Sequence, residues 1–114
     1  MIPKIIHIIW WQGINKIPNK FKTNVNSWKM HNKNYKIIIW DENMLKKFVN
    51  KNYENEWINL QKYNYMIQKI DYCKYLLLYY YGGVYVDIDI YCNVIILYYN
   101  QHRYRILQSY RNDV

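Results

Sequence analysis

Two patterns of apolar and polar positions alternate along the first part of the chain, and they predict strands and helices in turn. Residues 4–11 (KIIHIIWW) are an almost unbroken run of β-branched and aromatic side chains that closes on Gly13, which is typical of a short strand. Residues 35–40 (YKIIIW) repeat this pattern. Because such runs leave no polar face, both strands are expected to be buried on two sides, as in a parallel sheet.

Helical spacing appears between and after these two strands. Phe21, Val25 and Trp28 lie four and three positions apart, which indicates one face of a helix that begins near Pro18. After the second strand, Asp41 is a good N-cap for another helix. The apolar positions of that second helix are Leu45, Phe48 and Val49. Residues 50–64 are polar and aromatic and support no assignment.

A long apolar segment follows. Residues 65–81 contain neither proline nor glycine and are almost wholly apolar in their second half, so they predict a largely buried helix. Gly82 and Gly83 are expected to end it. Residues 84–91 (VYVDIDIY) alternate with the period of a strand, and residues 94–99 predict one more. The order predicts an α/β fold with a mostly parallel sheet and right-handed crossovers.

Length and composition limit the classes of protein that fit. With 114 residues, of which 52% are hydrophobic, the chain can form one domain, residues 1–114, with a real core. The net charge of +8 would favour anionic partners such as nucleic acid. However, the lysines are scattered, and the longest basic run is Lys46-Lys47, so we expect a solvated surface and no nucleic-acid partner. The absence of alanine indicates a nucleotide-skewed genome.

Cysteine usage and hydropathy bear on the compartment. Cys73 and Cys92 match neither a paired metal-binding motif nor a dense disulfide scaffold, so two buried, reduced thiols are expected. No apolar run approaches the roughly twenty residues of a transmembrane helix, and the N-terminus lacks a signal-peptide cleavage site. We expect an intracellular protein that is soluble or peripherally associated with a membrane.

Two aspartates stand at the end of the last strand. On a strand, Asp87 and Asp89 would share one face, where two like charges are unfavourable unless one is protonated or a cation lies between them. Hard oxygen ligands select Mn²⁺ or Mg²⁺, which bind phosphate oxygens well. Ligands of open α/β sheets bind at the carboxyl ends of strands. Alternatively, both aspartates lie in a loop after a short strand and face solvent.

A second charged pair lies on the long helix. Asp71 and Lys74 are three positions apart and therefore share one helix face inside an apolar segment. They are either ligand-binding groups or a plain salt bridge.

Three segments in this order carry a family resemblance. The stretches "IPKIIHIIW", "YKIIIWDEN" and "DYCKYLLLYYYGGVYVDID" resemble the sugar-binding region of glycosyltransferase family 32, the D-x-D transferases. That family includes yeast-type α-mannosyltransferases, inositol phosphorylceramide mannosyltransferases and capsular polysaccharide enzymes. The chain also looks, more distantly, like the glucosylating domain of clostridial toxins.

The resemblance implies a retaining, metal-dependent transferase, mannosyl- or glucosyl-, that uses a nucleotide-diphospho-sugar donor on a Rossmann-like (GT-A-type) fold. Carbohydrate, lipid and protein remain open as acceptors. The residues implied in catalysis and in binding Mn²⁺ or Mg²⁺ are Asp87 and Asp89, with Asp89 as the more direct metal ligand.

The resemblance also assigns substrate-binding roles. Trp10 would stack on the nucleotide base, Tyr85 would pack against the sugar and ribose, and Asp71 would bond sugar or ribose hydroxyls. Without the resemblance, Trp10 and Tyr85 would be interpreted as ordinary core aromatics, and Asp71 and Lys74 could also be structural. Lys74 stands where the family usually has an arginine, which keeps the charge and loses the bidentate fork.

The chain departs from the family in length. Members continue well beyond the D-x-D strand with an acceptor site, whereas only the residues from Asn93 onward follow here. We therefore expect the N-terminal portion of the fold, a truncated donor-binding domain. The alternatives to a transferase are a nucleotide-sugar-binding module without transfer activity and, more remotely, a basic nucleic-acid-binding protein.

Overall fold

A small parallel sheet forms the centre of the molecule. The structure, a computed structural model, describes residues 2–92. Strands β1 (Ile5–Ile9), β2 (Lys36–Trp40) and β3 (Val84–Tyr85) run parallel in the order β2-β1-β3, so β1 has a neighbour on each side. The α/β class and the parallel sheet are thereby confirmed, while the finer assignment to a GT-A-type transferase fold stays a prediction.

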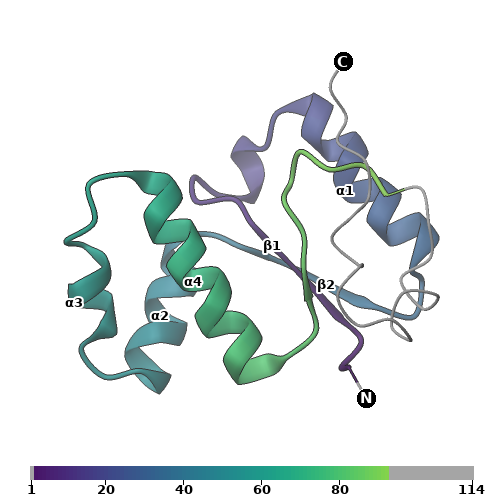
Figure 1. The fold of residues 1–114 in the computed structure, drawn as a ribbon. Coiled ribbons are helices and arrows are strands. Elements are labelled where there is room, and N and C mark those ends of the chain that lie inside the picture. Colours follow the sequence, from purple (N-terminus) through teal and green to yellow (C-terminus); the bar gives the residue numbers. More distant parts are fainter. Residues whose placement is uncertain (1, 93–114) are drawn as a thin grey trace.

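Helices cover both faces of this sheet (Figure 1). Helix α1 lies on one side, and α2, α3 and α4 gather on the other. The 3₁₀ turn η1 follows β1. The bounds are η1 Ile14–Lys16, α1 Asn19–His31, α2 Glu42–Asn52, α3 Glu56–Leu60 and α4 Met66–Tyr81.

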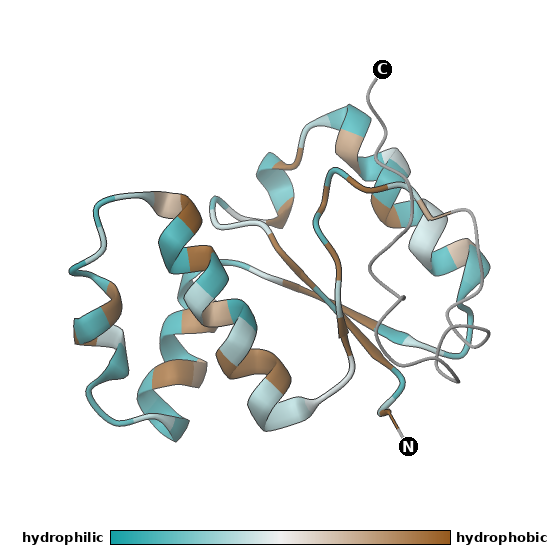
Figure 2. Ribbon diagram, in the orientation of Figure 1, coloured by the Kyte–Doolittle hydropathy of each residue, from teal (hydrophilic) through white to brown (hydrophobic). Residues whose placement is uncertain are grey.

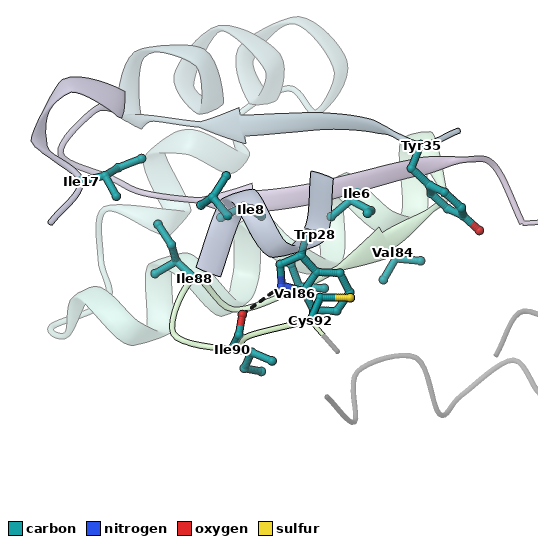
Figure 3. Packing of buried hydrophobic residues seen from close by; sticks show 11 residues of the cluster. Ile6, Ile8, Ile17, Trp28, Tyr35, Val84, Val86, Ile88, Ile90 and Cys92 are labelled. Carbon is teal, nitrogen blue, oxygen red and sulfur yellow. Dashed lines mark hydrogen bonds between the residues drawn. The ribbon is translucent and has the colours of Figure 1, made fainter. Parts of the chain in front are cut away.

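The central strand contributes to a separate core on each face. Ile6 and Ile8 pack in the cluster that contains Trp28 of α1 (Figure 3). Ile9 instead belongs to the cluster that contains Leu45 of α2. Figure 2 shows the hydrophobic residues concentrated along β1 and the neighbouring part of β2. The residues of β1 are apolar in an almost unbroken run because the strand is covered by helices on both faces, as predicted.

Both helix ends expected from capping residues are present. The Asp41 carboxylate accepts a hydrogen bond from the Met44 N–H at 2.9 Å and caps α2. Gly82 follows α4 with a φ of 70°, and its N–H bonds the Leu78 carbonyl at 2.9 Å. The short strand register after Gly83 then pairs Val84 with Ile6.

Three expectations about the second half of the chain need correction or extension. The helix at residues 65–81 exists, but it is not largely buried: only Cys73 and Leu77 are fully buried in it. The predicted length of the last strand is wrong, because β3 ends at Tyr85 instead of continuing to residue 91. The unassigned stretch 50–64 contains α3. The strand predicted at residues 94–99 lies outside the described residues.

Two further expectations concern the thiols and the membrane. Cys73 and Cys92 are both buried thiols that are not joined in a disulfide, as predicted. Burial raises the pKa of the Cys73 thiol to about 12, so this group is an unreactive thiol at neutral pH. Within residues 2–92, no helix combines the length and the apolar character needed to cross a bilayer.

The side chain of a buried histidine, His7, joins β1 to β2 and to the end of α4. His7, in the middle of β1, has no exposed surface. Its Nδ1 accepts a hydrogen bond from the Trp40 indole at 3.1 Å, so the proton of the neutral ring is on Nε2, which donates to the Gly82 carbonyl at 2.9 Å. Burial, opposed in part by the bond to Gly82, lowers the pKa of His7 below its ordinary value of 6.5.

Stability is therefore expected to fall as the pH drops below about 6.5. In that range the unfolded chain takes up a proton at His7 that the folded chain resists, and a protonated Nδ1 can no longer accept from Trp40. Urea unfolding between pH 7.5 and 5 should show a slope of up to about 1.4 kcal/mol per pH unit from this group. His7→Gln should be less stable but flatter over this interval, and an equally steep profile in His7→Gln would assign the slope to other groups.

Candidate functional site

A cavity opens at the carboxyl ends of β1 and β3. It has a volume of about 430 Å³. The position is the edge at which open parallel sheets bind their ligands. The lining residues come from the segment after β1, from α1, from α4 and from the segment around the end of β3: Ile9, Trp10, Trp11, Gln12, Phe21, Ile67, Ile70, Tyr85, Asp87, Ile88 and Asp89.

Both aspartates of the D-x-D line this cavity, but from a turn instead of a strand. The Ile90 N–H donates to the Asp87 carbonyl at 3.1 Å and closes the turn. Asp87 is exposed, whereas Asp89 is half-buried with its Oδ1 atom buried. The prediction that Asp87 and Asp89 belong to a strand is therefore wrong, because β3 ends at Tyr85. Both side chains nevertheless line the same cavity.

Tyr85 connects the aspartates to the core. Its side chain is only 5% exposed, and it lines the cavity together with Asp87 and Asp89. Burial is the largest cause that raises the pKa of Tyr85, followed by the negative charges of Asp87, Asp71 and Asp89. Tyr85 is thus both a core aromatic and a wall of the cavity, and three carboxylates make its surroundings strongly negative.

Asp71 and Lys74 form a salt bridge on α4, with 3.3 Å between Lys74 Nζ and Asp71 Oδ1. The ammonium group also lies 5.4 Å from the centre of the Tyr85 ring. Neither residue is part of the cavity lining described above. The structure therefore places this pair next to Tyr85 and shows the salt bridge that was one of its two interpretations, while a ligand-binding role stays a prediction.

Trp10 is another lining residue of the cavity. It is half-buried, its indole N–H donates to the Lys16 carbonyl at 3.2 Å, and its ring meets Phe21 edge-on with 5.7 Å between ring centres. The ring is therefore held from two directions while one part of it borders the cavity. Four of the six predicted site residues, Trp10, Tyr85, Asp87 and Asp89, line one space.

The donor set fits a divalent cation that shares its coordination with a ligand. Within residues 2–92, no three or more His, Cys, Asp or Glu side chains are grouped so that they could hold a metal ion by themselves. Mg²⁺ commonly binds through one or two carboxylates together with water and substrate phosphates. Asp87 and Asp89, in negatively charged surroundings, suit that arrangement better than a closed protein site.

Sequence reasoning missed most of the apolar wall. Phe21 had been placed on a helix face, but nothing in its spacing distinguished a cavity wall from core. Ile67 and Ile70 belong to α4, whose exposed side was not expected. Gln12 is the first polar residue after the end of β1 at Ile9, and that signal at a strand's carboxyl end could have identified it.

The structure is thus an α/β domain with a cavity, lined by acidic and aromatic side chains, at the carboxyl edge of its parallel sheet. Open α/β sheets bind their ligands at this edge. The family model described as "Glycosyltransferase sugar-binding region containing DXD motif" matches residues 18–104. The chain belongs to this glycosyltransferase family. No solved structure matches the chain significantly.

Relatives with curated descriptions agree with the family. An uncharacterized glycosyltransferase of Acanthamoeba polyphaga mimivirus is 37% identical over 93 residues, which cover 81% of this chain and 37% of that protein. Inositol phosphoceramide mannosyltransferase 1 of Schizosaccharomyces pombe is 36% identical over 94 residues, covering 80% of this chain and 29% of that protein. A mannosyl phosphorylinositol ceramide synthase of Saccharomyces cerevisiae is 33% identical over 89 residues, covering 78% and 23% respectively.

The chain thus aligns with only 23–37% of the length of these three relatives. The similarity shows the family of the sugar-binding region. It leaves the activity of a whole transferase to be proposed and tested.

Proposed function

We propose that this chain binds the donor of a metal-dependent hexosyltransferase, a nucleotide-diphospho-sugar. The observation that carries the proposal is the single cavity bordered by Trp10, Tyr85, Asp87 and Asp89. Mannose is the first sugar to test, because three relatives from Schizosaccharomyces pombe are named inositol phosphoceramide mannosyltransferases. We further propose that residues 1–114 act as one donor-binding domain.

Each wall of the cavity suits one part of such a donor. The flat Trp10 ring offers a stacking surface for a nucleotide base. Tyr85, which also lines the cavity, presents an aromatic face for the ribose or sugar. Asp71 and Lys74 are next to Tyr85, and we propose that they bind sugar hydroxyls and phosphate once the donor is bound. The Lys74 ammonium would act there as a point charge.

The two aspartates would hold the cation. Bound Mn²⁺ or Mg²⁺ would supply Lewis-acid stabilisation of the diphosphate that leaves the sugar. The contribution of the chain is to fix the turn that carries the two carboxylates: the hydrogen bond from the Ile90 N–H to the Asp87 carbonyl holds the backbone between them. Such fixed charge costs no reorganisation when the glycosidic bond breaks.

Calorimetric titration with UDP-, GDP- and ADP-sugars, GDP-mannose included, tests the proposal. We expect one of these donors to bind in the presence of Mn²⁺ and binding to fall at least about tenfold with chelator, because the phosphates would lose their bridge to the carboxylates. The matched nucleoside without phosphate should be indifferent to Mn²⁺. A folded chain that binds no donor under any of these conditions would overturn the proposal.

A second candidate is a donor-binding module without transfer activity. The observation that favours it is that Asp71 and Lys74 bond each other outside the cavity lining instead of facing the space where a donor would lie. Mn²⁺-dependent donor binding without hydrolysis or transfer of the sugar would favour this candidate over a complete enzyme. Release of free sugar or of a glycosylated product would favour the transferase.

A further inference from the structure

One face of α1 carries buried polar side chains that bond the segment after β3. The Asn24 amide donates to the Ile88 carbonyl at 3.0 Å, and the Trp28 indole donates to the Ile90 carbonyl at 2.9 Å (Figure 3). Ser27 accepts from the backbone N–H of residue 92 at 2.8 Å. These bonds join positions more than sixty residues apart in sequence. Helix α1 therefore anchors the backbone that carries the aspartates.

Asn24 has a special position in this set. Its partner, Ile88, is the residue between Asp87 and Asp89, so the bond acts at the middle of the D-x-D. The Asn24 side chain is only 2% exposed, and a donor lost from such a site leaves the Ile88 carbonyl without that bond in a poorly solvated place. The other two bonds attach to residues beyond the second aspartate.

Helix α1 also contributes to the aromatic part of the cavity lining, through Phe21. Phe21 lies one turn before Asn24, lines the cavity and meets the Trp10 ring edge-on at 5.7 Å. Residues three apart on a helix share a face. Helix α1 therefore contacts both the aromatic wall, formed by Trp10 and Phe21, and the acidic turn, residues 87–90, and it sets the distance between them.

We propose that Asn24 is a positioning residue for the donor site, acting through the Ile88 carbonyl on the two aspartates. This inference rests on the proposed function, because the aspartates are positioned for a cation and a diphosphate. Residues that orient ligand side chains without touching the metal typically contribute 10- to 100-fold to its affinity. Asn24 has that relation to Asp87 and Asp89, with a backbone carbonyl as the intermediate.

The test compares Asn24→Ala with Ser27→Ala in the full chain. Each substitution removes a buried hydrogen bond between α1 and the same segment, and Ser27→Ala also removes the bond from the Ser27 hydroxyl to the Asn24 carbonyl, so both should lower the thermal midpoint. Free Mn²⁺ is followed by electron paramagnetic resonance, with GDP and separately with UDP. Asn24→Ala is expected to weaken Mn²⁺ binding at least about tenfold, and Ser27→Ala by less than about threefold.

Hydrogen exchange at the Ile90 amide gives a readout that needs no ligand. This N–H donates to the Asp87 carbonyl, so its exchange rate reports how well the turn is closed. Exchange should quicken in Asn24→Ala and change little in Ser27→Ala. Should Asn24→Ala fail to fold, Asn24→Ser replaces it, since a short hydroxyl can bond its own helix but cannot replace the amide at Ile88.

The outcomes separate the two proposals. Equal losses of Mn²⁺ affinity in both variants, or an unchanged Ile90 amide in Asn24→Ala, would overturn the positioning role while the proposed function stands. A wild-type chain that binds no Mn²⁺ with either nucleotide would overturn the proposed function, and the positioning role with it.

Discussion

Replacing Asp87 and Asp89 together by asparagine is expected to abolish the Mn²⁺-dependent binding of a nucleotide-sugar. Asparagine keeps the size of each side chain but removes the charge that a hard cation requires. The loss should be at least about 100-fold, since groups that merely support metal ligands already contribute 10- to 100-fold. Asp89→Asn alone should cost more than Asp87→Asn, because Asp89 is the half-buried member and the proposed direct ligand.

The fold of the double variant should survive. In the absence of a cation, Asp87 and Asp89 place two like charges at the edge of one cavity, and their replacement by asparagine removes that repulsion. The thermal midpoint is therefore expected to stay the same or rise. Glu54→Gln, a neutralised exposed carboxylate outside the cavity lining, is the matched control and should bind donor normally. Normal Mn²⁺-dependent binding by the double variant would contradict any role for the D-x-D.

Much of the architecture could be predicted because it depends on local patterns. The apolar runs of β1 and β2 indicated strands covered on both faces, and the spacing of Phe21, Val25 and Trp28 indicated a helix. The capping residues Asp41 and Gly82 marked two helix ends correctly. Each of these signals lies within a few residues of the element that it describes, so no tertiary information was needed.

The errors arise where distant parts of the chain decide the structure. The alternation of residues 84–91 has the period of a strand, yet the chain turns after Tyr85 while Asn24 and Trp28 bond its carbonyls. Those partners are 64 and 62 positions away and leave no trace in the local pattern. The burial of α4 was overestimated because tyrosines count as apolar, although Tyr75 and Tyr79 stand 65% and 86% exposed.

The candidate site was accessible from sequence to the extent that its residues follow strands. Trp10 follows β1, and Asp87 and Asp89 follow β3, so their convergence at one sheet edge is a consequence of parallel topology. The supporting side chains Phe21 and Asn24 belong to a helix, where the sequence shows only that they share a face. What they support becomes visible only once α1 is packed against the turn.

Gly83→Ala is expected to have the largest effect on stability. Gly83 has a φ of 91°, which L side chains rarely adopt, and an added Cβ would lie 2.5 Å from the carbonyl oxygen of Ile5. Such an approach to the backbone of the central strand can be relieved only by moving β3 away from β1. Backbone strain of this kind costs about 1–3 kcal/mol by itself, and the clash adds to it.

Gly13→Ala separates the two contributions. Gly13 also has a positive φ, 112°, but an added Cβ there meets no atom within 4 Å. It should therefore carry the strain without the clash, and urea unfolding should show a clearly larger loss for Gly83→Ala. Equal losses would show that close packing of β3 on β1 contributes little. Because β3 leads directly into Asp87, a Gly83→Ala chain that still folds should also bind donor more weakly, which would tie the position of the acidic turn to the register of a two-residue strand.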